Sequence, residues 1–182
     1  MWPVSTAYGM PGFTRFPGPG TIRRPCLSDP EVRRQMAEKA EEVARKELGI
    51  RPIFGYLADE TSLVKDSLDL DTCSCEHCQA RYRQWLRGRY PSLNALNAEW
   101  GTRYGAWKEA GFTDYRQART AGNLAPWLAY RRFMDWTWAD AVRWASQHAR
   151  KADPTAMLAL ANSFGLNAFS GRDYQLLLDA ND

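Results

Sequence analysis

Four cysteines are the residues whose type and spacing most clearly indicate chemistry in this sequence. Cys73, Cys75 and Cys78 lie within about one turn of chain, and Cys26 is the only other cysteine. Thiolate sulfur is a preferred ligand of zinc, and four sulfurs complete a tetrahedral S4 site. The spacing therefore predicts a structural zinc ion that fastens the loop before one helix to the loop before another.

Disulfides are the competing interpretation. Cys73 and Cys75 are too close in sequence to pair comfortably, and any bridge within the cluster closes a very small loop. The spacing favours zinc, while disulfides and unligated thiols stay open as alternatives. We expect the ring of His77 to point away from the metal, because four sulfurs already fill its coordination. Thiolates kept for zinc fit a reducing compartment, which slightly favours the cytoplasm.

Two adjacent acids, Asp59 and Glu60, follow the apolar run 53–58. That run is short and not helically periodic, as expected of a buried parallel strand. Side chains from loops converge at the carboxyl ends of parallel strands, so the pair is a candidate for catalysis, with a capping or loop role as the alternative. Asn162 follows a second apolar run, 157–161, and we expect it at the same edge, in contact with substrate.

Composition sets broad limits. The chain has 182 residues, 45% of them hydrophobic, and a formal net charge of +3. It is long enough to bury a core, and we expect a single globular domain over 1–182. Basic residues are interleaved with acids, which argues against nucleic acid as the main partner. The apolar runs are far shorter than the ~20 residues of a membrane-spanning helix, so we expect no membrane partner.

Periodic apolar residues and capping signals predict the elements around these sites. Residues 1–25 are rich in glycine and proline and are expected to form an irregular loop. Ser28 and Glu31 form a predicted capping box for a helix that ends at Gly49, and Asn123 is the predicted cap of a long helix that stops before Asp153. Other helices are expected around 82–90, 93–100 and 176–178. Helices that alternate with buried strands indicate an α/β fold.

Five segments, in this order along the chain, resemble glycoside hydrolase family 42, the β-galactosidases built on (β/α)8 barrels: RRPCLSDPEVRRQ, GYLADE, CSCEHCQARYRQWLRGRY, LNALNAEWGT and YRRFMDWTWADAVRW. The resemblance runs from about residue 22 to the end of the sequence. It implies a partial (β/α)8 TIM barrel, about strands 4 and 5 with their helices. It also implies a structural zinc on the four cysteines, a carbohydrate substrate and a homo-oligomer, a trimer by family resemblance.

The same resemblance implies roles for the two strand-end acids. Glu60 matches the general acid/base of a retaining glycosidase, which protonates the leaving oxygen and then activates water. Asp59 stands where the family has an asparagine that contacts the sugar 2-hydroxyl. An ionised carboxylate can only accept hydrogen bonds, so the sugar preference stays open. Nothing in the sequence matches the attacking carboxylate, and a complete barrel needs ~250 residues, so we expect an incomplete barrel with little activity alone.

Trp107 is the remaining predicted substrate contact. The family tends to carry a tryptophan soon after the WGT triplet, and here Gly105 occupies the nearest register with Trp107 two residues later. We expect Trp107 to stack on sugar, with a role in the core as the alternative. The predicted function is thus retaining hydrolysis of β-linked galactosides or related glycans. The alternative is a non-catalytic zinc-binding or carbohydrate-binding module.

Overall fold

The described chain contains a small parallel sheet of three strands. The computed structural model describes residues 5–13, 21–48, 50, 52, 54–59, 61–63, 71–161 and 173–181. The strands β1 (Ser5–Ala7), β2 (Phe54–Asp59) and β3 (Leu158–Ala161) lie in the order β1-β2-β3, and both pairs are parallel. The two apolar runs predicted as strands therefore pair with each other, and β2 is the central strand.

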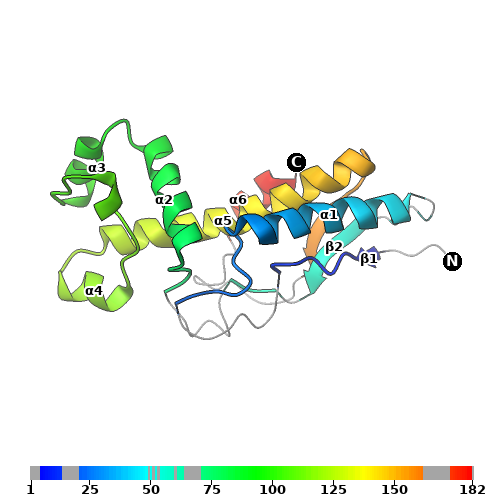
Figure 1. The fold of residues 1–182 in the computed structure, drawn as a ribbon, viewed down its shortest axis with the longest axis horizontal. Coiled ribbons are helices and arrows are strands. Elements are labelled where there is room, and N and C mark those ends of the chain that lie inside the picture. The colour runs from blue at the N-terminus through cyan, green and yellow to red at the C-terminus, as the bar shows by residue number, and fades with distance from the viewer. Residues whose placement is uncertain are drawn as a thin grey trace.

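Two long helices connect the strands. Helix α1 (Pro30–Glu47) lies between β1 and β2 in sequence, and α5 (Ala125–Ala152) leads into β3. They pack beside each other on the same side of the sheet (Figure 1). Sequential parallel strands with their connecting helices on one face have the winding of a (β/α) barrel, whereas doubly wound sheets carry helices on both faces.

The remaining helices extend the molecule along α5. Helix α2 (Glu76–Arg89) precedes α3 (Leu93–Trp100), the short 3-10 helix η1 (Trp107–Glu109) and α4 (Tyr115–Thr120). Both α3 and α4 lie at the end of the molecule away from the sheet (Figure 1). Helix α6 (Tyr174–Asn181) packs against α5.

Aromatic side chains on α2 and α5 fill much of the core. Tyr82, Phe133 and Trp138 are fully buried. The rings of Tyr82 and Tyr130 meet edge to face with centroids 4.6 Å apart, and Phe13 meets Trp138 in the same way at 4.9 Å. Large aromatic groups remove much apolar surface from water, and edge-to-face pairs add to that stabilisation. Aromatic contacts therefore help to hold α2 against α5.

The sequence predicted the main helices correctly and their ends less well. Asp29, and not Ser28, caps α1: its carboxylate accepts a hydrogen bond from the Glu31 amide at 2.9 Å. Asn123 is confirmed as a capping group of α5, since its Oδ1 accepts from the Ala125 amide at 3.0 Å, although the N-cap position itself is Leu124. The stop of α5 before Asp153 is also confirmed.

The sequence predicted an irregular loop over residues 1–25, and the structure shows that this prediction was partly wrong. Within that segment Ser5–Ala7 forms β1, which pairs with β2. A three-residue strand has no room for a periodic pattern, so only its pairing with a central strand reveals it. Neither η1 nor α4 was predicted from the sequence, although Asp114 and Gln117 form a capping box at the start of α4.

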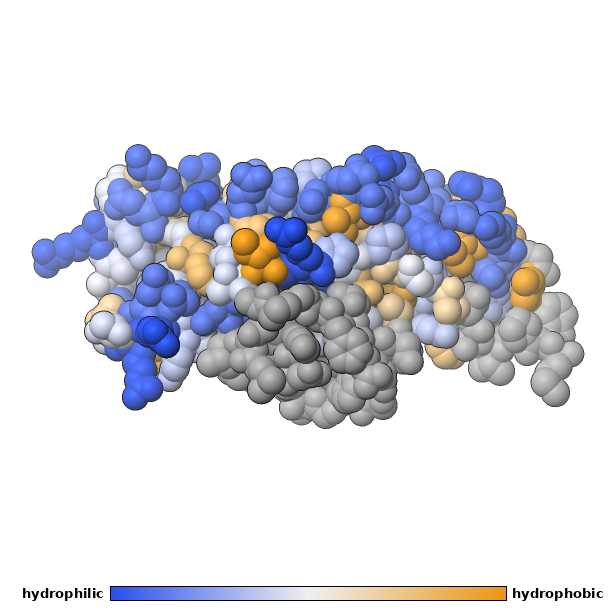
Figure 2. All heavy atoms as spheres, turned by 60° about the horizontal axis from the view of Figure 1, so that its bottom comes forward, coloured by the Kyte–Doolittle hydropathy of each residue, from blue (hydrophilic) through white to orange (hydrophobic). Residues whose placement is uncertain are grey.

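One face of the molecule shows a mixture of polar and apolar residues. On the face drawn in Figure 2, hydrophobic residues of the described chain show as separate small areas among hydrophilic ones. Scattered apolar residues of this kind are normal on a protein surface. None of the helices in the described ranges has both the length and the apolar character needed to cross a membrane.

Candidate functional site

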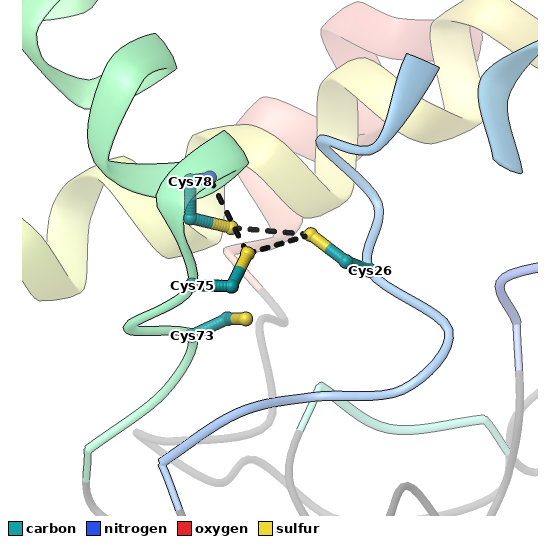
Figure 3. Close-up of side chains that lie close together, drawn as sticks. All are labelled: Cys26, Cys73, Cys75 and Cys78. Atoms are coloured by element: carbon teal, nitrogen blue, oxygen red, sulfur yellow. Dashed lines mark hydrogen bonds between the residues drawn. The ribbon is translucent and has the colours of Figure 1, made fainter. Parts of the chain in front are cut away.

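The four cysteines converge although they come from two distant segments. The Sγ of Cys26 lies 3.3 Å from that of Cys75 and 3.5 Å from that of Cys78, and all four Sγ atoms, including that of Cys73, lie within 4.8 Å of one another (Figure 3). A disulfide would need about 2.05 Å between sulfurs. Four thiolates around one zinc ion at about 2.3 Å lie ~3.8 Å apart, so the sulfur set fits a tetrahedral ion.

Helix α2 supplies two of the candidate ligands. Cys75 is its N-cap, and Cys78 belongs to its first turn. The Cys75 Sγ accepts a hydrogen bond from the Cys78 amide at 3.5 Å. The amino terminus of a helix carries partial positive charge, which favours thiolate over thiol. The cap position thus aims one sulfur at the site and stabilises its anionic form.

Cys73 is held from two sides. The Ser74 amide donates to the Thr21 carbonyl at 2.7 Å, which joins the loop before α2 to the loop that leads to Cys26. From α5, the Tyr130 hydroxyl donates to the Cys73 carbonyl at 2.6 Å, and the Cys73 amide donates to Met134 Sδ at 3.3 Å. The geometry of the cluster is therefore fixed by neighbouring protein groups as well as by any bound ion.

Hydrogen bonds to the cysteine sulfurs change how readily each thiol loses its proton. Backbone amides of Arg23 and Ser28 donate to the sulfurs of Cys73 and Cys26, each at 3.3 Å. Contacts with the other three thiols, that with Cys26 first, hold the pKa of Cys75 below its usual range. A thiolate binds zinc without first losing a proton, so the lowered pKa of Cys75 favours metal binding at that sulfur. Contacts with the other thiols, that with Cys73 first for Cys26 and that with Cys26 first for Cys78, raise the pKa of those two residues, so a metal would have to displace protons there.

His77 lies outside the sulfur cluster, as predicted. Its Nε2 lies 4.0 Å from Asp29 Oδ2, beside the cap of α1, and it is not one of the residues whose ligand atoms converge. The described donors are thus all sulfur, which is the composition of a structural zinc site and not of a catalytic one with an open position.

The predicted substrate residues at the sheet edge are only partly described. Asp59 is the last residue of β2, and its backbone is in register with Ala161 at the end of β3. Glu60 and Asn162, which follow these two residues in sequence, lie outside the described residues. The backbone therefore brings the two strand ends side by side, and the roles of Asp59, Glu60 and Asn162 stay predictions.

Trp107 lies in the helical extension and not beside the strands. It begins η1, and the Arg87 guanidinium of α2 lies over its ring, 5.7 Å from the centroid. Its side chain is partly buried against the core. The described structure does not bring Trp107 to the strand ends, and its predicted contact with sugar stays a prediction.

The sequence did not predict the burial of Arg23 or the ion pairs of Asp140. Arg23 is 1% exposed and lies beside the cysteines. Asp140 of α5 accepts hydrogen bonds from Arg33 of α1, at 2.8 Å, and from Arg81 of α2. The only sequence signal was a pair of arginines before Pro25, and no local pattern distinguishes a buried arginine from an exposed one.

A cavity of about 280 Å³ lies where α2, α3 and the start of α5 meet. Trp85, Tyr90 and Trp100 contribute aromatic walls, and Glu99 and Arg132 contribute charge. It contains none of the sequence-predicted site residues. Among the described residues, the predicted metal ligands are therefore the predicted site residues that the structure brings together.

Comparison with known proteins decides the family. A family model for glycoside hydrolase family 42, described as β-galactosidase, matches residues 14–180. The chain belongs to glycoside hydrolase family 42. The chain is 40% identical over 68 residues to β-galactosidase BgaB of Geobacillus kaustophilus. This alignment covers 35% of the chain and 10% of that protein. It is 30% identical over 112 residues to β-galactosidase YesZ of Bacillus subtilis strain 168, which covers 61% of this chain and 16% of the relative.

Solved structures agree on the fold. The β-galactosidase of Rahnella sp. R3 superposes with a TM-score of 0.71 and 21% identity, over 86% of this chain and 22% of that one. That of Halorubrum lacusprofundi gives a TM-score of 0.68 and 20% identity, over 91% and 24%. The structural neighbours are TIM-barrel glycosidases. The family 42 chain thus corresponds to a limited part of the length of these proteins, with a fold typical of their barrel.

Proposed function

We propose that this chain contributes the general acid/base of a retaining glycoside hydrolase that acts on β-linked galactosides. The observation that carries the proposal is the family match over residues 14–180, within which the central strand β2 ends at Asp59, directly before Glu60. In parallel (β/α) folds, catalytic groups come from the carboxyl ends of strands. Glu60 occupies that position in the sequence.

The proposed chemistry follows from the two steps of retaining hydrolysis. Glu60 donates a proton to the leaving oxygen while a second carboxylate attacks the anomeric carbon, and it then takes a proton from the water that releases the sugar. We assign β2 and β3 to strands 4 and 5 of the barrel, which makes β1 the strand before them. Their sequential parallel order supports this assignment.

The cysteine cluster has a structural part in this proposal. We infer that Cys26, Cys73, Cys75 and Cys78 hold one zinc ion, which fixes the loop before α1 to the start of α2. The convergence of four sulfurs within 4.8 Å supports this ligand set. Zinc bound by four thiolates has no open coordination position for substrate, so the ion stabilises the fold and takes no part in hydrolysis.

The decisive experiment compares Glu60→Gln with the unchanged protein, expressed from its complete reading frame, on two β-galactosides. An alkyl galactoside has a poor leaving group and needs the acid, so we expect its hydrolysis to fall by about 10²–10⁴-fold. The nitrophenolate group of a nitrophenyl galactoside leaves readily without a proton, so we expect the rate of glycosidic bond cleavage in this substrate to fall much less. This dependence on leaving group identifies a general acid.

Asp59→Asn serves as the matched control beside the acid. It removes the charge but keeps the size of the side chain, and we expect a change in KM or sugar preference without the leaving-group dependence. Equal rates for Glu60→Gln and the unchanged protein on both substrates would remove Glu60 from the mechanism. Binding of galactosides without any hydrolysis would instead identify a carbohydrate-binding module.

A further inference from the structure

Arg23 joins three separate loops through one buried guanidinium. Its Nε donates to the Leu63 carbonyl at 3.2 Å, and its Nη2 donates to the carbonyls of Gly12 at 2.7 Å and Ser62 at 3.5 Å. Its Nη1 donates to the carbonyl of Pro25. Gly12 follows β1, Pro25 precedes α1, and Ser62 and Leu63 follow β2. A single side chain therefore holds together the segments that leave two neighbouring strands.

The other end of Arg23 is attached to the cysteine cluster. Its backbone amide donates to Cys73 Sγ at 3.3 Å, and its guanidinium lies over the ring of Trp138 on α5, 5.5 Å from the centroid. Burial lowers its pKa to about 10, with the nearby cysteine sulfurs opposing the effect, so the group is charged at neutral pH. A buried cation is costly unless its donors are satisfied, and these carbonyls satisfy them.

We propose that Arg23 is a positioning residue that makes the order of the loop after β2 depend on the metal-binding cysteine cluster. Arg23 holds the carbonyls of Ser62 and Leu63, and residues 61–63 directly follow Glu60 in sequence. When the cluster is closed, the backbone at Arg23 is fixed and its side chain holds this loop. When the cluster opens, the anchor of the guanidinium is lost. An effect of this coupling on catalysis rests on the proposed role of Glu60. The coupling between the cysteine cluster and the loop does not.

The geometry requires arginine and not merely a positive charge. The guanidinium is a planar fork whose nitrogens donate in several directions at once, so it reaches carbonyls on different loops. Lysine presents all its donors from one atom and can satisfy only part of this set. We therefore expect Arg23→Lys to restore a part of what Arg23→Gln loses.

The test measures amide hydrogen exchange of residues 61–63 in the full chain, with zinc bound and after chelation. In the unchanged protein we expect chelation to speed this exchange about tenfold, because the loop opens locally. In Arg23→Gln we expect fast exchange even with zinc bound, and less than twofold further change on chelation. Arg24→Gln is the matched control: Arg24 is the exposed neighbour, and its variant should behave as the unchanged protein.

The zinc content of the Arg23 variants shows whether Arg23 positions the loop or is needed for metal binding. We expect Arg23→Gln and Arg23→Lys to retain about one zinc per chain and their helical circular dichroism. Loss of zinc in both variants, or of the fold in both, would overturn the proposal, since Arg23 would then serve the metal site or the whole core. Slow, zinc-dependent exchange of residues 61–63 in Arg23→Gln would overturn it as well.

A kinetic readout links the coupling to hydrolysis. If the proposed function holds, Arg23→Lys lowers kcat for a galactoside more than it changes KM, because the acid is misplaced while the sugar contacts remain. Absence of hydrolysis in the unchanged protein, with the exchange results as expected, refutes the proposed function and leaves the coupling intact. The two proposals therefore fail in distinguishable ways.

Discussion

The sulfur atoms of Cys26 and Cys75 lie 3.3 Å apart although the two residues are 49 positions apart in sequence. Cys26 leads into α1 and Cys75 caps α2, so the contact joins the amino ends of two helices. The long helix α5 packs against both. A metal ion at this point would hold the amino ends of α1 and α2 together.

Replacing Cys75 with serine tests the metal site without removing the helix cap. Serine is a good N-cap residue, so α2 keeps its capping group while the site loses one sulfur. We expect bound zinc to fall from about one per chain to nearly none. When free zinc exceeds its dissociation constant about 1,000-fold, the free energy of unfolding should fall by about 4 kcal/mol. Metal content and urea unfolding measure the two effects.

Chelation provides the control for this variant. The zinc-free unchanged protein and Cys75→Ser should unfold at similar urea concentrations, because both lack the same ion. A Cys75→Ser protein that keeps a full equivalent of zinc, or that is destabilised far beyond the chelated protein, would show that the four sulfurs do not act as one metal site.

Asp140→Asn tests the charged bridge between α1, α2 and α5. The substitution keeps the shape of the side chain but leaves Arg33 and Arg81 close together without the carboxylate between them. These side chains are only 15–20% exposed, so we expect a loss of about 2 kcal/mol in urea unfolding. Glu38→Gln is the control, because that carboxylate pairs with Arg34 at the exposed surface, where solvent screens the pair and its contribution is small. Similar small losses for both variants would contradict the prediction.

Asp135 predicts a specific dependence of stability on pH. Burial raises its pKa to about 6, and Arg131, 4.0 Å away, offsets only part of the effect. The folded state therefore holds this proton more tightly than the unfolded chain, where the ordinary value is about 3.9. The free energy of unfolding should fall as pH rises from about 4 to about 6, by about 2 kcal/mol, and this contribution should stay constant above that range.

Asp135→Asn should remove this part of the pH dependence. We expect the stability difference between the variant and the unchanged protein to change between pH 4 and pH 6, in favour of the variant at the higher pH. Urea unfolding in the presence of chelator keeps proton competition at the cysteines out of the comparison. A difference that is constant across this range would contradict the raised pKa of Asp135.

We expect alanine to have opposite effects on stability at two glycine positions. A Cβ at Gly55 in β2 would collide with the ring of Tyr8 and lie 2.9 Å from Leu158 Cδ2, so Gly55→Ala should cost about 1–3 kcal/mol. A Cβ at Gly88 in α2 would meet nothing within 4 Å, so Gly88→Ala should stabilise the helix by about 0.5–1 kcal/mol. Thermal unfolding of the two variants measures both effects. A tolerated alanine at position 55 would show that the loop after β1 does not lie against the sheet as described.

The sequence determined those features whose signals are local. Helix α3 begins at the Ser92 cap and ends at Gly101, which adopts the left-handed conformation that glycine favours. Residues 93–100 could be predicted as a helix because apolar spacing, cap and terminating glycine all lie within ten positions. The candidate metal ligands could be named for a similar reason: cysteine is scarce in the sequence, and its chemistry leaves few alternatives.

Tertiary structure alone decided what depends on distant segments meeting. The strand β1 exists because three residues pair with β2, and Asp140 becomes a bridge because α5 passes between two arginines of other helices. Arg23 looks like any loop arginine in the sequence, yet it is buried among carbonyls from three loops. Local periodicity reflects contacts within a helix or strand, whereas the partners of a buried charge are set by the packing of the whole chain.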